Sequence, residues 1–197
     1  KIFDKIIINS DSMIFKKIAQ QYKVGFYLRP KNLGSAQTKS DNVVKDFLLN
    51  NSSDLLVWVN PIAPLQKSSE IKDIVNYFIK NKLNSLITVS DRQVHCLYKN
   101  NPVNFNTSEK FKKTQELRPV QEMVYSIMMW NSRTFLKAMK DKRYAILHGK
   151  INFYKVHKLS ALIVKDYYDL SLIKNLIDNK KKKLHVTYHK SIKSLKK

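Results

Sequence analysis

The chain has 197 residues, and its hydrophobic share of 43% is enough to bury the core of one globular domain. No apolar run is long enough to cross a bilayer, and the single cysteine, Cys96, excludes an internal disulfide and a cysteine-based zinc site. The net charge of +22 favours anionic partners, but only 5 of the 37 basic residues are arginine, so a specific nucleic-acid interface is not predicted. No secretory signal precedes the first apolar stretch, and a cytoplasmic location is expected.

Apolar strands and amphipathic helices alternate in the first half of the chain. The patterns predict strands at 3–9, 24–28, 54–60 and 85–90, and helices at 12–22, 41–49 and 68–81, the last with Ser68 as its capping residue. The stretch 54–60 is apolar throughout, which is typical of a strand buried on both faces of a parallel sheet. This alternation predicts an α/β layered fold with right-handed crossovers.

After Ser90 the pattern changes to a mixed one. It predicts a hairpin at 94–106 with Asn100 and Asn101 at its tip, strands at 124–130, 144–156 and 160–164, and helices at 132–139 and 166–177. Cys96 is interpreted as a small buried strand residue. We therefore expect a parallel, doubly wound half followed by a mixed half with a β-rich excursion. The lysine-rich tail 179–197 is either simply solvated or bound to an anionic surface.

Polar groups follow the first three predicted strands. Asp11 and Ser12 follow the first, Arg29 follows the second before a polar loop that contains Gly34, and Asn60 follows the third. Ligands of such sheets bind at the carboxyl ends of the strands, so these groups fit a pocket for a polar, anionic ligand. Each also has a plain structural explanation: Asp11 and Ser12 as helix caps, Arg29 as a surface arginine, and Asn60 as a turn residue before Pro61.

Several motifs occur here in a characteristic order. They are "INSDS" at 8–12, "RPKNL" at 29–33, "TKS" at 38–40 and "NPIAPLQ" at 60–66. In this order they resemble the acylneuraminate cytidylyltransferase family, whose members show V-S-T-D, R-P-x-x-L, T-x-S and Q-x-T-S-P-L-R. The resemblance extends from about 3 to about 177. It implies a Rossmann-like three-layer α/β sandwich of the nucleotide-diphospho-sugar transferase type over 1–178, with a strand-rich dimerisation excursion at about 92–117 and therefore a homodimer.

The resemblance also implies the reaction and the nucleotide site. Such enzymes transfer CMP from CTP to a 2-keto sugar acid such as a sialic acid, releasing pyrophosphate for the synthesis of surface glycans. Carried over to this chain, Arg29 contacts the nucleotide, Ser40 its base or ribose, and Thr38 and Asp11 lie nearby. A guanidinium, small hydroxyls and a helix N-terminus suit a triphosphate and a cytosine edge.

For the sugar acid, the resemblance implies four residues. Asn60 replaces a glutamine that contacts the sugar acid in relatives, Gln121 matches an R-x-x-Q segment, and Tyr125 and Asn131 correspond loosely to a later Y…N-G. In this chain the N-G reads Asn131-Ser132.

The metal-binding motif of the family is not preserved in this chain. The D-x-D that would hold Mg²⁺ aligns with Ile163-Val164-Lys165, and Lys165 cannot bind a metal, although its ammonium can neutralise phosphate or a sugar carboxylate. Asp166 and Asp169 lie one turn on and are the substitute ligands, with Lys165 and Asp166 as candidate catalytic residues. The alternative interpretation is that both aspartates cap and solvate the last helix.

Members of the family begin with a further strand and a basic, glycine-bearing loop that cradles the triphosphate. This chain starts at Lys1, where that segment would end, so we expect a fragment or a processed chain that does not turn over CTP by itself. Two other hypotheses stay open: a degenerate relative that binds nucleotide or sugar without catalysis, and a basic nucleic-acid-binding protein.

Overall fold

The computed structural model describes residues 2–179, which form two compact units that meet between Ile163 and Val164. Each unit is described by itself. Of the predicted basic tail only Asn179 falls within the described residues, and the remainder lies outside them. No helix among the described residues is long and apolar enough to span a membrane.

A four-stranded mixed sheet forms the centre of the first unit. Its order is β3 (Leu55–Val59), β7 (Val120–Asn131), β4 (Ser85–Arg92) and β8 (Ile151–Lys155). The strand β7 runs antiparallel to both of its neighbours, whereas β4 and β8 are parallel. Parallel pairing of β4 with β8 requires a crossover, and the chain between them supplies β7 and a helix.

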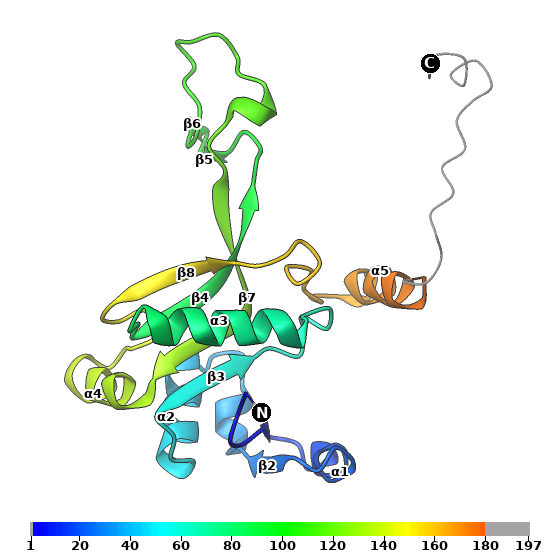
Figure 1. Ribbon diagram of the computed structural model, residues 1–197, viewed down its shortest axis with the longest axis vertical. Helices are drawn as coiled ribbons and strands as arrows, with labels where there is room; N and C mark the ends of the chain where they lie inside the picture. The colour runs from blue at the N-terminus through cyan, green and yellow to red at the C-terminus, as the bar shows by residue number, and fades with distance from the viewer. Residues whose placement is uncertain (1, 180–197) are drawn as a thin grey trace. The chain divides into compact units, whose positions relative to one another are not determined.

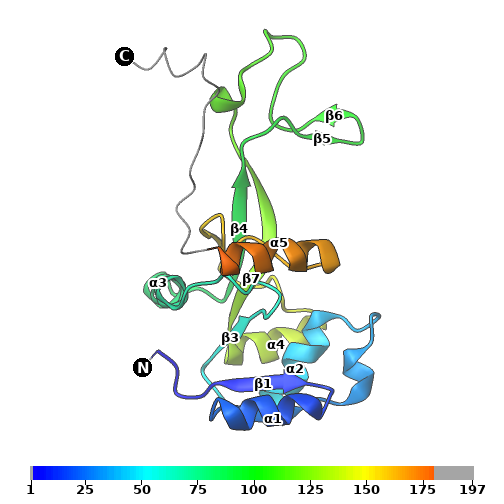
Figure 2. The same ribbon diagram turned by 90° about the vertical axis from the view of Figure 1, so that its right-hand side faces the viewer.

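Helices cover both faces of this sheet, so the unit has three layers (Figures 1 and 2). On one face, α3 (Ser68–Lys80) packs against alternate residues of the central strands, including Leu86, Ile127 and Met129. On the other, α2 (Ser40–Asn50) and α4 (Ser132–Lys142) pack against the intervening residues Ile87, Met128 and Trp130. The period of two along each strand divides the apolar side chains between two cores.

The first part of the chain forms a separate parallel pair. Strand β1 (Ile7–Ser10), helix α1 (Ile14–Gln21) and strand β2 (Gly25–Leu28) make a β-α-β unit whose strands pair in register from Ile7 with Gly25 to Ser10 with Leu28. The second unit contains α5 (Tyr167–Asp178), which matches the last predicted helix within one residue.

The expectation that residues 54–60 lie in a parallel sheet is wrong. β3 has apolar side chains toward both cores, with Leu55 and Val57 on one face and Leu56 and Trp58 on the other. Its partner strand, however, is the antiparallel β7. A continuous apolar run indicates that both faces of a strand are buried, but it does not indicate whether the neighbouring strand is parallel or antiparallel.

The strands of the β-rich excursion are shorter than expected. Between β4 and β7 lie only the two-residue strands β5 (Leu97–Tyr98) and β6 (Asn101–Pro102), with a 3₁₀ turn, η2 (Thr114–Glu116). The hairpin tip is Lys99-Asn100, one residue earlier than predicted, because Tyr98 pairs with Asn101 and the two tip residues adopt φ of 48° and 65°. Cys96 precedes β5 and is half-buried, so its interpretation as a buried strand residue is wrong.

Two other predicted strands are loops. Residues 160 and 161 end a turn and 162–164 have no regular secondary structure, because Ala161 N–H donates to the His157 carbonyl and Leu162 N–H to that of Leu159, which pairs these backbone groups locally. Residues 144–150 form a loop before β8. The expected serine cap is also absent: α3 begins after Lys67, and Ser68 makes no capping hydrogen bond.

Candidate active site

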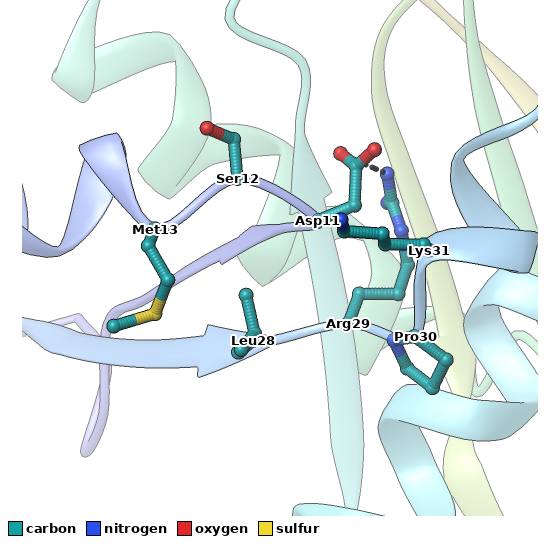
Figure 3. Close-up of a pocket in the computed structure, with 7 residues that line it drawn as sticks. All are labelled: Asp11, Ser12, Met13, Leu28, Arg29, Pro30 and Lys31. Carbon is teal, nitrogen blue, oxygen red and sulfur yellow. Dashed lines mark hydrogen bonds and ion pairs between the residues drawn. The ribbon is translucent and has the colours of Figure 1, made fainter.

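A surface pocket of about 630 Å³ lies at the carboxyl ends of β1 and β2 (Figure 3). It is lined by Asp11, Ser12, Met13, Leu28, Arg29, Pro30 and Lys31. The register of β1 and β2 creates it, because Arg29 N–H donates to the Ser10 carbonyl at 2.8 Å and so continues the pairing one residue beyond the strands. The pocket therefore brings together Asp11, Ser12 and Arg29, as expected. Asn60 does not line it, because β3 belongs to the other sheet.

An ion pair joins the two strand ends across this pocket. Arg29 Nη2 donates to Asp11 Oδ1 at 3.3 Å, and Figure 3 shows both side chains on the same side of the strands. The Arg29 side chain is only 16% exposed and that of Asp11 is 41% exposed. Arg29 Nε and Asn9 Oδ1 are buried and have no hydrogen-bond partner within the described residues. Buried polar atoms are nearly always paired, so the Nε donor without a partner is an exception that a ligand's acceptor would remove.

The loop after Arg29 returns to this ion pair. The 3₁₀ turn η1 (Lys31–Gly34) places Gly34 against Asp11, where an added Cβ would lie 2.2 Å from Oδ2 and 2.7 Å from Cγ. A Cβ at this position would force the Asp11 carboxylate to move, and glycine allows the close approach. Asp11 therefore packs against the turn and does not cap α1, which begins after Met13 without a side-chain cap.

The two hydroxyl residues of "TKS" lie beyond this turn. Thr38 Oγ1 donates to the Asn32 carbonyl at 2.8 Å and lies 2.9 Å from Ser35 Oγ, so it stabilises the loop. Ser40 is the first residue of α2, exposed, with Lys39 at the N-cap position. A helix N-terminus with an exposed hydroxyl suits an anionic or polar ligand group.

Two of the predicted sugar-acid residues, Asn60 and Tyr125, lie near the end of β3. Asn60 N–H donates to the carbonyl of Ser126, the residue that follows Tyr125, at 2.9 Å. The Asn60 side chain accepts from Ile62 N–H at 3.3 Å and thus also serves its turn. Tyr125 is 44% exposed and sits in a bulge of β7 with φ of 51°, an uncommon conformation for an aromatic residue.

The other two lie elsewhere on the same strand. Gln121 is exposed near the start of β7 and donates to Asp91 Oδ1 at 3.2 Å. Asn131 ends β7, opposite Leu55 at the start of β3, and its side chain caps α4 by accepting from Thr134 N–H at 3.0 Å. Ten residues of strand separate Gln121 from Asn131, roughly 30 Å at about 3.3 Å per residue. They do not meet at one pocket.

The candidate metal residues form a reciprocal cap on α5 in the second unit. Asp166 Oδ1 accepts from Asp169 N–H, and Asp169 Oδ2 accepts from Lys165 N–H, each at 2.9 Å. This is the alternative that the sequence left open for both aspartates. No group of three or more histidine, cysteine, aspartate or glutamate side chains suited to a metal occurs within residues 2–179.

Comparison with known proteins places these features in a family. The chain matches the family described as "Cytidylyltransferase" over residues 1–192, which is nearly its whole length. It belongs to the cytidylyltransferase family. The resemblance inferred from the motifs is thereby confirmed.

The curated relatives are distant and longer. N-acylneuraminate cytidylyltransferase of Streptococcus agalactiae serotype III (strain NEM316) is 23% identical over 145 residues, covering 69% of this chain and 35% of that protein. The enzyme of the same name from S. agalactiae serotype V (strain ATCC BAA-611 / 2603 V/R) is 24% identical over 151 residues, with the same coverage. The chain therefore spans about a third of the length of these relatives.

Solved structures confirm the α/β fold. A 4-diphosphocytidyl-2C-methyl-D-erythritol synthase from Anaerococcus prevotii superposes with a TM-score of 0.63 at 12% identity, covering 89% of this chain and 79% of that one. A CMP:2-keto-3-deoxy-manno-octonic acid synthetase complexed with CTP gives the same TM-score at 7% identity, covering 89% and 81%.

Sequence reasoning missed two features of this pocket. Lys31 lines the pocket beside Arg29, but it was one lysine among many and carried no distinguishing signal. The close packing of Gly34 against the Asp11 carboxylate was also missed, although glycine occurs only 3 times in the chain. That scarcity was the signal that could have revealed it.

Proposed function

We propose that the whole protein transfers CMP from CTP to a 2-keto sugar acid of the sialic acid type, with release of pyrophosphate. The observation that carries this proposal is the position of Arg29 in a member of the cytidylyltransferase family, at a strand-end pocket with its Nε buried and without a partner within the described residues. The names of the curated relatives support the choice of acceptor. Synthesis of surface glycans is the corresponding biological role.

In this reaction the anomeric hydroxyl oxygen of the sugar acid attacks the α-phosphorus of CTP. A bond forms between that oxygen and phosphorus, the hydroxyl proton passes to water, the bond to the bridging oxygen of the β-phosphate breaks, and pyrophosphate leaves with the bonding pair. The protein's task is to align the two substrates and to neutralise their charge. Arg29 and Lys31 supply positive charge at the pocket, and Ser40 and Thr38 supply hydroxyls near the base or ribose.

The sugar acid is assigned to Asn60 and to Tyr125, whose neighbour Ser126 accepts the hydrogen bond from Asn60 N–H. Gln121 and Asn131 lie along the same strand at its two ends and are assigned to this substrate by the resemblance alone. We propose that Asn60 and Tyr125 make the direct contacts.

The residues present do not fit the Mg²⁺ that the resemblance implies. Asp166 and Asp169 each have an oxygen committed to the α5 cap, and the position of the second D-x-D carboxylate is taken by Lys165. No catalytic step is therefore derived through the metal. Lys165 is assigned to the neutralisation of substrate charge by the resemblance alone. Its backbone N–H is held by Asp169, whose own N–H is held by Asp166.

We also propose a homodimer and a cytoplasmic location. The excursion presents strongly exposed apolar side chains, including Leu97, Tyr98 and Phe111, of the kind that a subunit interface covers. CTP, the proposed donor, is a cytoplasmic nucleotide.

The second candidate is a relative that binds CTP or the sugar acid without catalysis, and the missing D-x-D favours it. Calorimetry of the whole protein with CTP, UTP and a DNA duplex separates the two CTP-binding candidates from the nucleic-acid-binding hypothesis, and pyrophosphate release separates the first two from each other. Selective CTP binding supports the cytidylyltransferase and its non-catalytic counterpart. Tight duplex binding with a steep salt dependence and no CTP binding would instead support the nucleic-acid-binding hypothesis.

A further inference from the structure

Asp11 is an acidic side chain in a pocket proposed to receive a triphosphate. A carboxylate that faced the phosphates would repel them, and this repulsion is strong where water is partly excluded. In the structure the carboxylate is paired with Arg29. Oδ1 accepts from Arg29 Nη2 at 3.3 Å, and Oδ2 lies close to Gly34, where an added Cβ would overlap it.

The contact between Asp11 and Gly34 depends on the turn that follows Arg29. Leu33 N–H donates to the Pro30 carbonyl at 3.0 Å, and the Thr38 hydroxyl donates to the Asn32 carbonyl at 2.8 Å, which together hold the turn closed. Gly34 stands where a Cβ would overlap Asp11 Oδ2 at 2.2 Å. The turn, the carboxylate and the guanidinium therefore form one packed series of groups.

Arg29 retains donors for a ligand while Asp11 holds it. A guanidinium has five N–H donors, and a single donor, on Nη2, is committed to Asp11. The Arg29 side chain is only 16% exposed, and its buried Nε has no partner within residues 2–179. A long side chain that is fixed in this way loses less conformational entropy when it binds an anion.

We propose that Asp11 is a positioning residue for Arg29 and not a ligand of the nucleotide, and that Gly34 keeps the two in contact. This inference rests on the proposed function. It differs from the contact implied by the family resemblance, because Asp11 acts on CTP only through the Arg29 guanidinium.

A double-mutant cycle on the whole protein tests this inference. CTP dissociation constants are measured for the parent, Asp11→Asn, Arg29→Ala and the double variant, with thermal unfolding as a check of folding. Asp11→Asn is expected to weaken CTP binding about 10-fold, the equivalent of one charge-assisted hydrogen bond. In the Arg29→Ala background the same change is expected to have little effect. Asp141→Asn, which removes an exposed acid of α4, is the matched control.

Gly34→Ala supplies an independent variant, because it keeps the carboxylate and displaces it. It is expected to weaken CTP binding as Asp11→Asn does, and to add little in the Asp11→Asn background. Tighter CTP binding by Asp11→Asn, or full additivity with Arg29→Ala, would overturn the proposal.

A second readout needs no nucleotide and so separates failure of this inference from failure of the proposed function. Nuclear magnetic resonance of the Arg29 Nε–H group reports rotation of the guanidinium and exchange of its proton with water. Slow exchange in the parent and faster exchange in Asp11→Asn and Gly34→Ala are expected. Equal exchange rates in all three proteins would contradict the positioning role even if CTP binds.

Discussion

At the scale of single residues, Arg29 carries the nucleotide assignment. Its guanidinium is mostly buried and paired with Asp11, yet its Nε has no partner within the described residues. Arg29→Ala is expected to weaken CTP binding roughly 10- to 100-fold, since hydrogen bonds to charged groups contribute about 1.5–3 kcal/mol. Sugar-acid binding should change much less. Calorimetry with each substrate measures both effects.

The control for Arg29→Ala is Arg133→Ala, which removes an equal charge from the exposed surface of α4. If both variants bind CTP as the parent does, the assignment of Arg29 is wrong.

A second residue-scale prediction concerns the bulge that carries Tyr125. The pairing of β4 with β7 shifts between Ile87 and Val89, and the fully buried Thr88 hydroxyl bridges the shift. Thr88 Oγ1 accepts from Ile127 N–H and donates to the Ile127 carbonyl, each at 3.0 Å. Thr88→Val should lower the free energy of unfolding by about 1–3 kcal/mol, because it leaves buried backbone groups unpaired.

Urea unfolding of Thr88→Val beside Thr88→Ser measures this cost. The serine variant keeps the hydroxyl and should recover most of the lost stability. A valine variant as stable as the serine variant would show that the hydroxyl does not support the bulge.

At the scale of elements, the ion pairs of the central sheet predict a pH dependence. Lys155 Nζ lies 2.7 Å from Asp91 Oδ2, and this contact, followed by the Gln121 hydrogen bond, holds the pKa of Asp91 below its ordinary value of 3.8. A lowered folded-state pKa adds stability above the unfolded value of the pKa. That stability is lost as the pH falls through the folded-state value.

The melting temperature of Lys155→Met should therefore decrease less steeply than that of the parent as the pH falls from roughly 5 to 2 at low salt. Lys158→Met removes an exposed lysine from the loop after β8 and is the control. Superimposable stability curves of Lys155→Met and the parent would count against this ion pair.

The excursion gives a further prediction at this scale. Its apolar side chains Leu97 and Tyr98 are 60% and 67% exposed. If they lie in a subunit interface, Leu97→Glu combined with Tyr98→Glu should convert a dimer to a monomer in light scattering. Ile79→Glu, a comparably exposed apolar position on α3, should leave the dimer intact. A parent protein that is itself monomeric would refute the dimer.

The sequence predicted the helices better than the strands, for a physical reason. Amphipathic spacing identified α2, α3, α4 and α5, since the hydrogen bonds of a helix are local, and α2, α3 and α4 each pack an apolar stripe against the central sheet. Residues 160–164 were apolar enough for a strand, but Ser160 donates to Glu70 and the chain turns instead. The direction of β7, and therefore the partner of β3, depends on long-range pairing that no local pattern encodes.

The candidate site was predictable in part for the same reason. Asp11 and Arg29 follow consecutive parallel strands, so their proximity follows from the topology. The caps made by Asn131 and Asp166 are local, and the structure shows these roles directly. The contact of the Asp11 carboxylate with Gly34 is a tertiary contact and was not predicted.

At the scale of the whole molecule, the chain is a cytidylyltransferase-family α/β unit that spans about a third of its curated relatives. We propose that the whole protein makes a CMP-sugar from CTP and a 2-keto sugar acid. The most direct test follows pyrophosphate release and the phosphorus resonances of CTP with a sialic acid, with and without EDTA. Release of pyrophosphate is expected only when both substrates are present, and turnover is expected to be lost in Arg29→Ala. CTP that binds and is never converted, with any of a panel of 2-keto sugar acids, would contradict the proposal.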